Sequence, residues 1–400
     1  MSDQLLSVPV KVSSEIDIST PLKAALKQKG YRPLEAEWFQ EFEKLRNLSV
    51  DKNLSKNQAS VETLNRYYDQ LAVLHDKNLG NIPNLSLYWE SSLEKGGFFG
   101  GKYYTYSSNL EFERVAVLYN IGAIQSALGA DYRASNNDEG LKNAAKCYQN
   151  AAGIFINLCE TKQETLGITE GYTLTNDLNS DALSALAALM VAQAQEMFVT
   201  KAILDSMKDG IVAKLCAQAE DLYKDAILKL KKDNVRSLWE STWMNHAKGK
   251  QLAFEGLSQF FQSKVCGTKK LIGEQLGRLT LSLDLLKKAQ DKLGAGGFVT
   301  KFIAEAEKQY SLAKKDNDMI YLELVPPAEK LDPIDRVASA RLAKALPCPE
   351  KLSTNFKDIF EGMAIDPNAV NPPTLKSIFG STVQALGKYV EKKLLTPENK

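Results

Sequence analysis

The sequence has few of the residues on which most catalytic and metal sites depend. Only two histidines, His75 and His246, occur in 400 residues, far apart and each within a helical pattern. The five cysteines are well separated and form no CxxC pair, which argues against a zinc site or a disulfide framework and suits a reducing compartment. GxSxG and HExxH motifs are also absent. We therefore expect a protein that is not an enzyme and needs no cofactor or metal.

Net charge and long apolar runs are equally scarce. Fifty basic residues nearly cancel 49 acidic ones, so bulk charge gives no reason to expect nucleic-acid binding. The first 20 residues lack the basic start and apolar run of a signal peptide. By inspection, no window approaches the roughly 18 uncharged apolar residues of a membrane span. These absences predict a soluble cytoplasmic protein.

Proline is missing from the whole interior of the chain, between Asn84 and Val325. A long proline-free stretch rich in Ala, Leu, Lys and Glu is typical of stacked helices, because an interior proline removes a backbone hydrogen bond. Small residues recur where neighbouring helices would cross, which suggests a degenerate tetratricopeptide-like solenoid. The apolar pattern predicts helices over residues 33–47, 56–75, 112–128, 137–159, 179–207, 211–232, 235–264 and 269–292.

The two ends of the chain differ from this interior. Val8, Val10 and Val12 alternate and predict a short edge strand, with a second strand or tight segment at 85–89. The sequence after Val325 is rich in proline, which predicts an extended segment that packs along the helices as a strap. A last amphipathic helix is predicted over residues 374–395.

Residues 192–223 form the most informative stretch, the end of one helix and the start of another with a predicted break at Asp209-Gly210. At about 100° per residue, the second helix spreads its apolar residues over roughly 160°, whereas one core needs a stripe only about 100° wide. Ile211 and Leu215 lie towards one edge of that arc. They are either free for a partner or buried because the helix lies between two neighbours.

The loop from Gly96 to Tyr103 nearly matches a phosphate-binding loop, but Tyr103 stands where that loop needs Ser or Thr for Mg²⁺. We therefore reject nucleotide hydrolysis. Phe98 and Phe99 between paired glycines predict an exposed apolar hairpin tip that inserts into a membrane interface or a partner's pocket. The alternative is that one ring folds back onto the body of the protein.

Several separated blocks resemble one family, the Bro-one domain, and most closely its ALIX branch of endosomal adaptors. They include Arg66-Tyr67-Tyr68-Asp69-Gln70, Asn137-Asp138-Glu139-Gly140-Leu141-Lys142, Ala192-Gln193-Ala194-Gln195-Glu196, Met207-Lys208-Asp209 and Lys314-Lys315-Asp316-Asn317-Asp318. Their order and spacing are specific. The resemblance implies that residues 1–365 form one domain. This domain would be a mostly α, boomerang-shaped helical solenoid with a small N-terminal β-sheet and a C-terminal strap. Residues 366–400 would then be a linker or the start of a truncated region.

The resemblance also implies a task and a site. Members of this family bind the C-terminal amphipathic helix of an ESCRT-III subunit of the charged multivesicular body protein four type, and so recruit their parent protein to endosomal membranes. By matching positions, Phe198, Ile211 and Leu215 would be the apolar contacts and Asp138 and Lys142 the rim. Lys201 and Lys214 would add charge complementarity to an acidic helix. We expect a monomer.

Two further points stay open at this stage. Tyr321 resembles a tyrosine that can be phosphorylated in animal relatives, and the alternative is a ring packed under the strap. The function could instead be that of a general helical-repeat scaffold for another peptide, or of a regulatory domain in a longer phosphatase-type member of the family.

Overall fold

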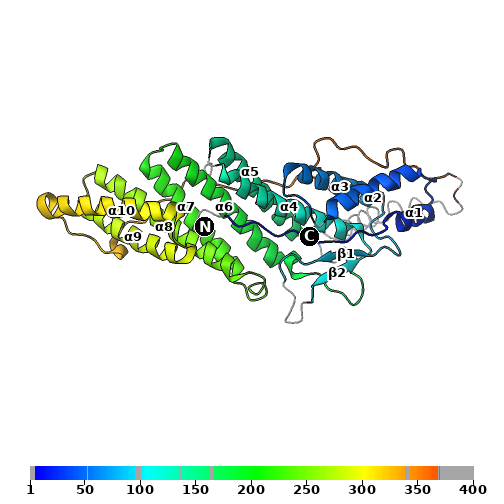
Figure 1. The fold of residues 1–400 in the computed structure, drawn as a ribbon, viewed down its shortest axis with the longest axis horizontal. Helices are drawn as coiled ribbons and strands as arrows, with labels where there is room; N and C mark the ends of the chain where they lie inside the picture. Colours follow the sequence, from blue (N-terminus) through cyan, green and yellow to red (C-terminus); the bar gives the residue numbers. More distant parts are fainter. Residues whose placement is uncertain are drawn as a thin grey trace, which may run out of the picture.

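The computed structural model describes residues 5–51, 53–94, 101–135, 137–161, 166–337, 342–367 and 369. Within them, helices α4 to α9 stand side by side, each antiparallel to the next, in an elongated row (Figure 1). The α-helices are α1 (Ser19–Gln28), α2 (Ala36–Val50), α3 (Gln58–Asp76), α4 (Leu110–Ala134), α5 (Asp138–Glu160), α6 (Ser180–Leu204), α7 (Asp209–Leu230), α8 (Ser241–Thr268), α9 (Ile272–Leu293) and α10 (Gly297–Asp316). The predicted mostly helical solenoid is confirmed.

The predicted helices differ from the observed ones by up to six residues, at their starts and at their ends. The helix expected from residue 235 begins only at Ser241, because successive turns precede it, with Leu238 N–H donating to the Val235 carbonyl at 3.0 Å. Helices α1 and α10 were not predicted. The helix expected from residue 137 begins as anticipated, since the Asn137 side chain accepts a hydrogen bond from Gly140 N–H at 2.7 Å and caps α5.

The predicted strand at Val8, Val10 and Val12 is wrong. This segment is extended but pairs with no strand among the described residues apart from a bridge between Ser13 and Trp89. Its backbone bonds to side chains of α4 instead: Lys11 N–H donates to Asn120 Oδ1 at 2.6 Å, and Asn120 Nδ2 donates back to the Lys11 carbonyl at 3.0 Å. The small sheet consists of β1 (Leu87–Glu90) and β2 (Tyr104–Ser107), so the second strand expected at 85–89 is confirmed.

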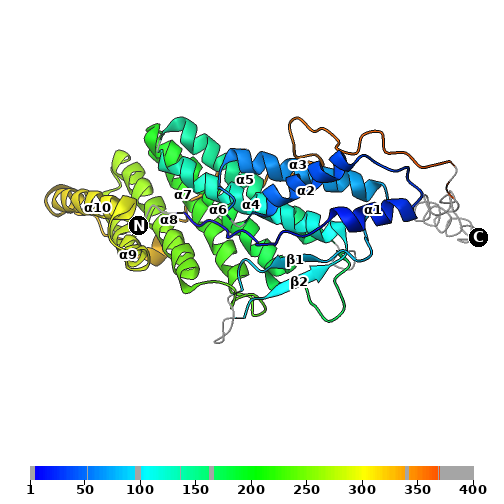
Figure 2. The ribbon, with the colours of Figure 1, turned by 45° about the vertical axis from the view of Figure 1, so that its right-hand side comes forward.

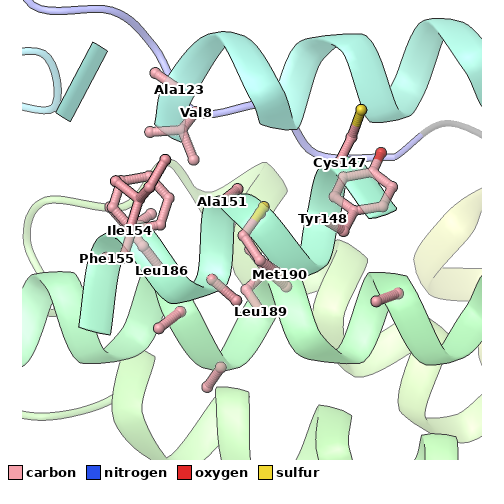
Figure 3. Close-up of a cluster of buried hydrophobic side chains, with 14 of the residues drawn as sticks. Val8, Ala123, Cys147, Tyr148, Ala151, Ile154, Phe155, Leu186, Leu189 and Met190 are labelled. Carbon is pink, nitrogen blue, oxygen red and sulfur yellow. The ribbon is translucent and has the colours of Figure 1, made fainter. Parts of the chain in front are cut away.

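Part of the core lies between α4, α5 and α6, where Tyr148, Phe155, Leu186 and Met190 are buried near Val8 of the N-terminal segment (Figure 3). Helix α6 is long and apolar enough to cross a membrane, although its uncharged run between Asp181 and Glu196 has only 14 residues. However, 83% of its apolar window is buried in the protein. Its alanines let α5 and α7 approach on either side, which explains this composition by packing.

In its described parts the chain after Val325 is mostly extended, as predicted, and we call residues 326–337 and 342–367 the strap. Near α9, the Asp332 carbonyl accepts a hydrogen bond from Arg278 Nη2 at 2.9 Å. Further on, the Asp69 carboxylate of α3 accepts from the backbone N–H of Leu352 at 3.0 Å. The strap therefore runs along the row of helices from α9 back to α3 (Figure 2). The helix predicted over residues 374–395 lies outside the described residues.

Candidate functional site

The break between α6 and α7 lies slightly earlier than predicted. Helix α6 ends at Leu204, and Ser206 in the following turn has a left-handed backbone conformation with φ of 50°. Helix α7 then begins at Asp209, so Gly210 lies within its first turn rather than in the interhelix turn. The Asp209 carboxylate accepts from Lys264 Nζ of α8 at 2.6 Å, and a negative charge at a helix start is favourable.

Charged residues join the start of α5 to the end of α6. The Asp138 carboxylate pairs with Lys142 Nζ at 2.6 Å and also with Lys201, whose Nζ reaches Asp205 at 2.9 Å. Hydrogen bonds from Lys142 and then from Lys201 lower the pKa of Asp138, and the bond to Asp138 raises the pKa of Lys201. The structure thus brings the two predicted rim residues, Asp138 and Lys142, into one network with Lys201.

The three predicted apolar contacts differ in exposure. Phe198 and Ile211 are half-buried at the adjoining ends of α6 and α7, where a partner can reach them. Leu215 is only 4% exposed, which agrees with the alternative that the helix lies between two neighbours. Its contact with a partner stays a prediction. Burial follows from its place beside α6, where Gln195 Nε2 donates to the Leu215 carbonyl at 3.5 Å.

Two further apolar residues on the α6–α7 turn were missed. Leu204 is 52% exposed and Met207 is 40% exposed, between Phe198 and Ile211 in the chain. The sequence could have predicted their exposure, because these two large apolar residues flank a short polar turn. We use the name helix-end surface for Asp138, Lys142, Phe198, Lys201, Leu204, Met207 and Ile211.

The strap crosses the same side of the helices as the helix-end surface. The backbone N–H of Leu346 donates to the Gln149 carbonyl at 3.0 Å, and Gln149 lies seven residues beyond Lys142 on one face of α5. On α6, the N–H of Ala343 donates to Gln195 Oε1 at 2.9 Å. Seven residues correspond to about 10 Å along a helix, so the strap closes one end of the surface.

Lys214 does not join the helix-end surface as a free cation. Its Nζ lies 2.8 Å from the Asp335 carboxylate of the strap, and hydrogen bonding to Lys214 lowers the pKa of Asp335. Lys214 therefore contacts the strap through an exposed ion pair, and its role towards an acidic partner stays a prediction.

A buried ion pair fixes α6, α7 and α8 beneath this surface. The Glu196 carboxylate accepts from Lys250 Nζ of α8 at 2.6 Å and from the Tyr223 hydroxyl of α7 at 2.8 Å. Burial, together with the Glu196 charge, raises the pKa of Tyr223. Because Glu196 lies two residues before Phe198, this network sets the position of Phe198 relative to α7.

His246 predicts a specific pH dependence of stability. Burial, together with the nearby Lys250 charge, lowers its pKa from 6.5 to about 3. The unfolded chain therefore binds one more proton than the native protein between these values, and His246 lowers the stability as the pH falls through that window. We expect His246→Leu to flatten the decline of the urea midpoint between pH 7 and pH 5. A decline as steep as in the wild type would contradict this assignment.

The remaining predicted residues lie elsewhere. Tyr321 ends a single π-helical turn, η3 (Asn317–Tyr321), and is 38% exposed, so it is not packed under the strap. Phe98 and Phe99 lie outside the described residues. In the part of the chain that the structure describes, no group of three or more His, Cys, Asp or Glu side chains is placed to hold a metal ion.

Comparison with known proteins places this fold and surface in context. The BRO1-like domain family matches residues 5–365. The chain is 36% identical to apoptosis-linked gene 2-interacting protein X 1 of Caenorhabditis elegans, covering 89% of this chain and 40% of that protein. It is 34% identical to human programmed cell death 6-interacting protein, covering 90% and 41%, and 30% identical to the yeast pH-response regulator palA/RIM20, covering 89% and 50%. The chain thus spans about half or less of the length of these relatives.

Solved structures agree with the sequence relatives. The ALIX BRO1 domain, in a structure described as a complex with CHMP4C, superposes with a TM-score of 0.79 at 32% identity, covering 90% of this chain and 99% of that one. ALIX in complex with a viral late-domain peptide also gives a TM-score of 0.79, at 30% identity, covering 97% of this chain and 53% of that one. The chain therefore belongs to the BRO1-like domain family.

Proposed function

We propose that this chain is a non-enzymatic adaptor domain that binds the C-terminal amphipathic helix of an ESCRT-III subunit and recruits its parent protein to endosomal membranes for cargo sorting and membrane scission. The observation that carries the proposal is the helix-end surface, in which Phe198 and Ile211 stay half-exposed on adjoining helices within a charged rim. A relative at 32% identity that covers nearly the same residues forms a complex with CHMP4C.

The chemistry of the surface suits an amphipathic helix. Such a helix presents apolar residues at intervals of three and four, and it needs apolar anchors of matching spacing on the receiving surface. Phe198, Ile211, Leu204 and Met207 offer these anchors. Leu215 lies one turn beyond Ile211 on α7, is 4% exposed, and would complete the surface as a buried contact.

The rim gives a prediction about charge. Lys142 and Lys201 already pair with Asp138 at an exposed site, so an acidic partner would exchange one ion pair for another. We expect Lys142→Ala to weaken binding by less than about 1 kcal/mol, with most of the change in the association rate. Stopped-flow association at low and high salt measures this. A loss as large at high salt as at low salt would contradict a rim role.

The proposal is separated from a general peptide scaffold by titrating a labelled C-terminal helix of CHMP4C against one with the same composition in scrambled order. An adaptor of the proposed kind binds the native helix and not the scrambled one. Leu228→Asp is the matched control on α7, since Leu228 is 68% exposed and lies 17 residues, about 25 Å, beyond Ile211. Equal binding of the two peptides would favour the scaffold.

Two subsidiary proposals concern contact with the membrane and regulation by phosphorylation. The Phe98-Phe99 loop would add a peripheral membrane contact. Phosphorylation of Tyr321, whose ring is 38% exposed, would add negative charge at the end of α10. Vesicle flotation of the Phe98→Ser, Phe99→Ser variant tests the first, and treatment with a tyrosine kinase followed by peptide mass analysis tests the second.

A further inference from the structure

The end of the helical row opposite α1 carries a cluster of exposed apolar side chains. Met319 is 73% exposed, Ile320 68%, Leu322 75% and Leu324 95%. We call residues 319–324 the α10 tip, because they directly follow α10 at the extremity of the molecule (Figures 1 and 2). Single exposed apolar residues are common in soluble proteins, but contiguous groups of this kind mark interaction sites.

The backbone of the α10 tip is held in a defined conformation by hydrogen bonds. Leu322 has φ of 54°, a left-handed conformation that a leucine rarely adopts, and its N–H donates to the Asn317 carbonyl at 2.8 Å. The Asn317 side chain is 7% exposed and bonds both backbone groups of Glu323, each at 3.0 Å. These bonds hold the turn so that its apolar side chains point outwards, although a relaxed turn could fold them back.

The tip is also fixed to the turn between α8 and α9. The Glu323 carboxylate accepts from the N–H of Gly273 at 2.7 Å, at the start of α9. The Leu324 carbonyl lies so close to Gly273 that an added Cβ would come within 2.4 Å of it. Lys269, Lys270 and the 43% exposed Leu271 therefore lie beside the tip.

The charges around the tip leave a small excess of cations. Lys314 pairs with Asp318 at 2.9 Å, and the Glu323 carboxylate accepts from Gly273 N–H but keeps its negative charge. Lys269, Lys270 and Lys315 are exposed and form no ion pair within the described ranges. On the same segments, Asp316 and Glu323 are the acidic residues without a described cationic partner. An apolar group beside a net positive charge is the combination that binds anionic membrane interfaces.

We propose that the α10 tip inserts into the headgroup region of an anionic lipid membrane. Met319, Ile320, Leu322 and Leu324 would enter the boundary between headgroups and acyl chains, while Lys269, Lys270 and Lys315 contact lipid phosphate or carboxylate groups. A lipid surface fits better than a peptide or a second copy, because the apolar residues project from the end of the molecule and their surroundings are cationic. The proposal does not depend on the helix-end surface, which lies on α5 to α7.

The test is flotation of the full chain with vesicles of phosphatidylcholine alone and with added phosphatidylserine. We expect the wild type to float with the anionic vesicles and to lose binding at high salt. Leu322→Ser with Leu324→Ser should lower the bound fraction at least about fivefold, because two exposed apolar anchors are removed. Lys269→Gln with Lys270→Gln should lower binding to anionic vesicles only. Leu228→Ser is the matched control, since Leu228 is 68% exposed on α7, and it should float like the wild type.

Several results would overturn the proposal. One is flotation of the Leu322→Ser, Leu324→Ser variant equal to that of the wild type, and another is a wild type that does not float. Self-association without lipid that the same substitutions abolish would identify the tip as an interface between copies. All variants should keep their circular dichroism and their affinity for the CHMP4C helix, so failure here is distinct from failure of the proposed function. A Phe98→Ser, Phe99→Ser variant measures the loop separately.

Discussion

Ile211→Asp is expected to abolish binding of the ESCRT-III helix and to leave the fold intact. A carboxylate placed among Phe198, Leu204 and Met207 would be desolvated by the partner without an ionic counterpart. Loss of a central apolar anchor costs about 2 kcal/mol or more, a factor of roughly 30 in affinity. Fluorescence anisotropy with a labelled CHMP4C helix measures the loss, and circular dichroism with thermal melting measures the fold.

Leu215→Asp is the informative comparison for that experiment. Leu215 is 4% exposed, so a charge there must be buried, and the variant should lose about 3 kcal/mol of folding stability as well as binding. If Leu215→Asp melted like the wild type and Ile211→Asp did not, the structural assignment of the two residues would be reversed. Unchanged binding in Ile211→Asp would remove the helix-end surface from the account.

Glu196→Ala should destabilise the whole domain by about 3–5 kcal/mol, because it leaves the Lys250 ammonium buried without a counter-charge. Lys250 is fully buried, and Glu196 is 3% exposed. Urea denaturation followed by circular dichroism measures the change. The effect should be large at any salt concentration, unlike that of an exposed pair such as Lys142 and Asp138.

A double variant shows whether the charge or the volume matters. Glu196→Leu together with Lys250→Met removes both charges and keeps apolar volume, and it should recover most of the stability lost in Glu196→Ala. If the double variant is as unstable as the single one, the loss comes from the hydrogen bond of Tyr223 or from packing. In either case, binding of the ESCRT-III helix by both variants should be measured. Because α6 and α7 meet at this network, a change in affinity would report a shift of Phe198.

The helical architecture followed from the sequence because its signals are local. The proline-free interior, the alanine-studded crossings and the Asn137 cap each act within a few residues, and the structure places helices at all these positions. The strap was also predictable, because its prolines exclude a helix and its apolar residues need a surface on which to pack. The family resemblance placed Asp138 and Lys142 at the rim of a binding surface, and the structure pairs Asp138 with both Lys142 and Lys201. Their contact with a partner stays a prediction.

The errors have a common physical cause, which is partners distant in the chain. The Val8, Val10 and Val12 segment alternates like a strand, but the Asn120 side chain of α4 takes both backbone hydrogen bonds of Lys11. The burial of Leu215 and the ion pair of Lys214 were not predicted, because they depend on Gln195 and Asp335. The α10 tip escaped notice because its exposure depends on the Asn317 bonds and the contact with Gly273.

The most direct test of the central claim is the saturation binding curve of the wild-type chain with the labelled CHMP4C helix, repeated with Phe198→Asp. We expect one saturable site for the wild type and no saturation for the variant, with both proteins giving the same circular dichroism spectrum. Saturation of both proteins with equal affinity would contradict it, because the helix would then bind away from the helix-end surface. So would a wild-type curve that does not saturate.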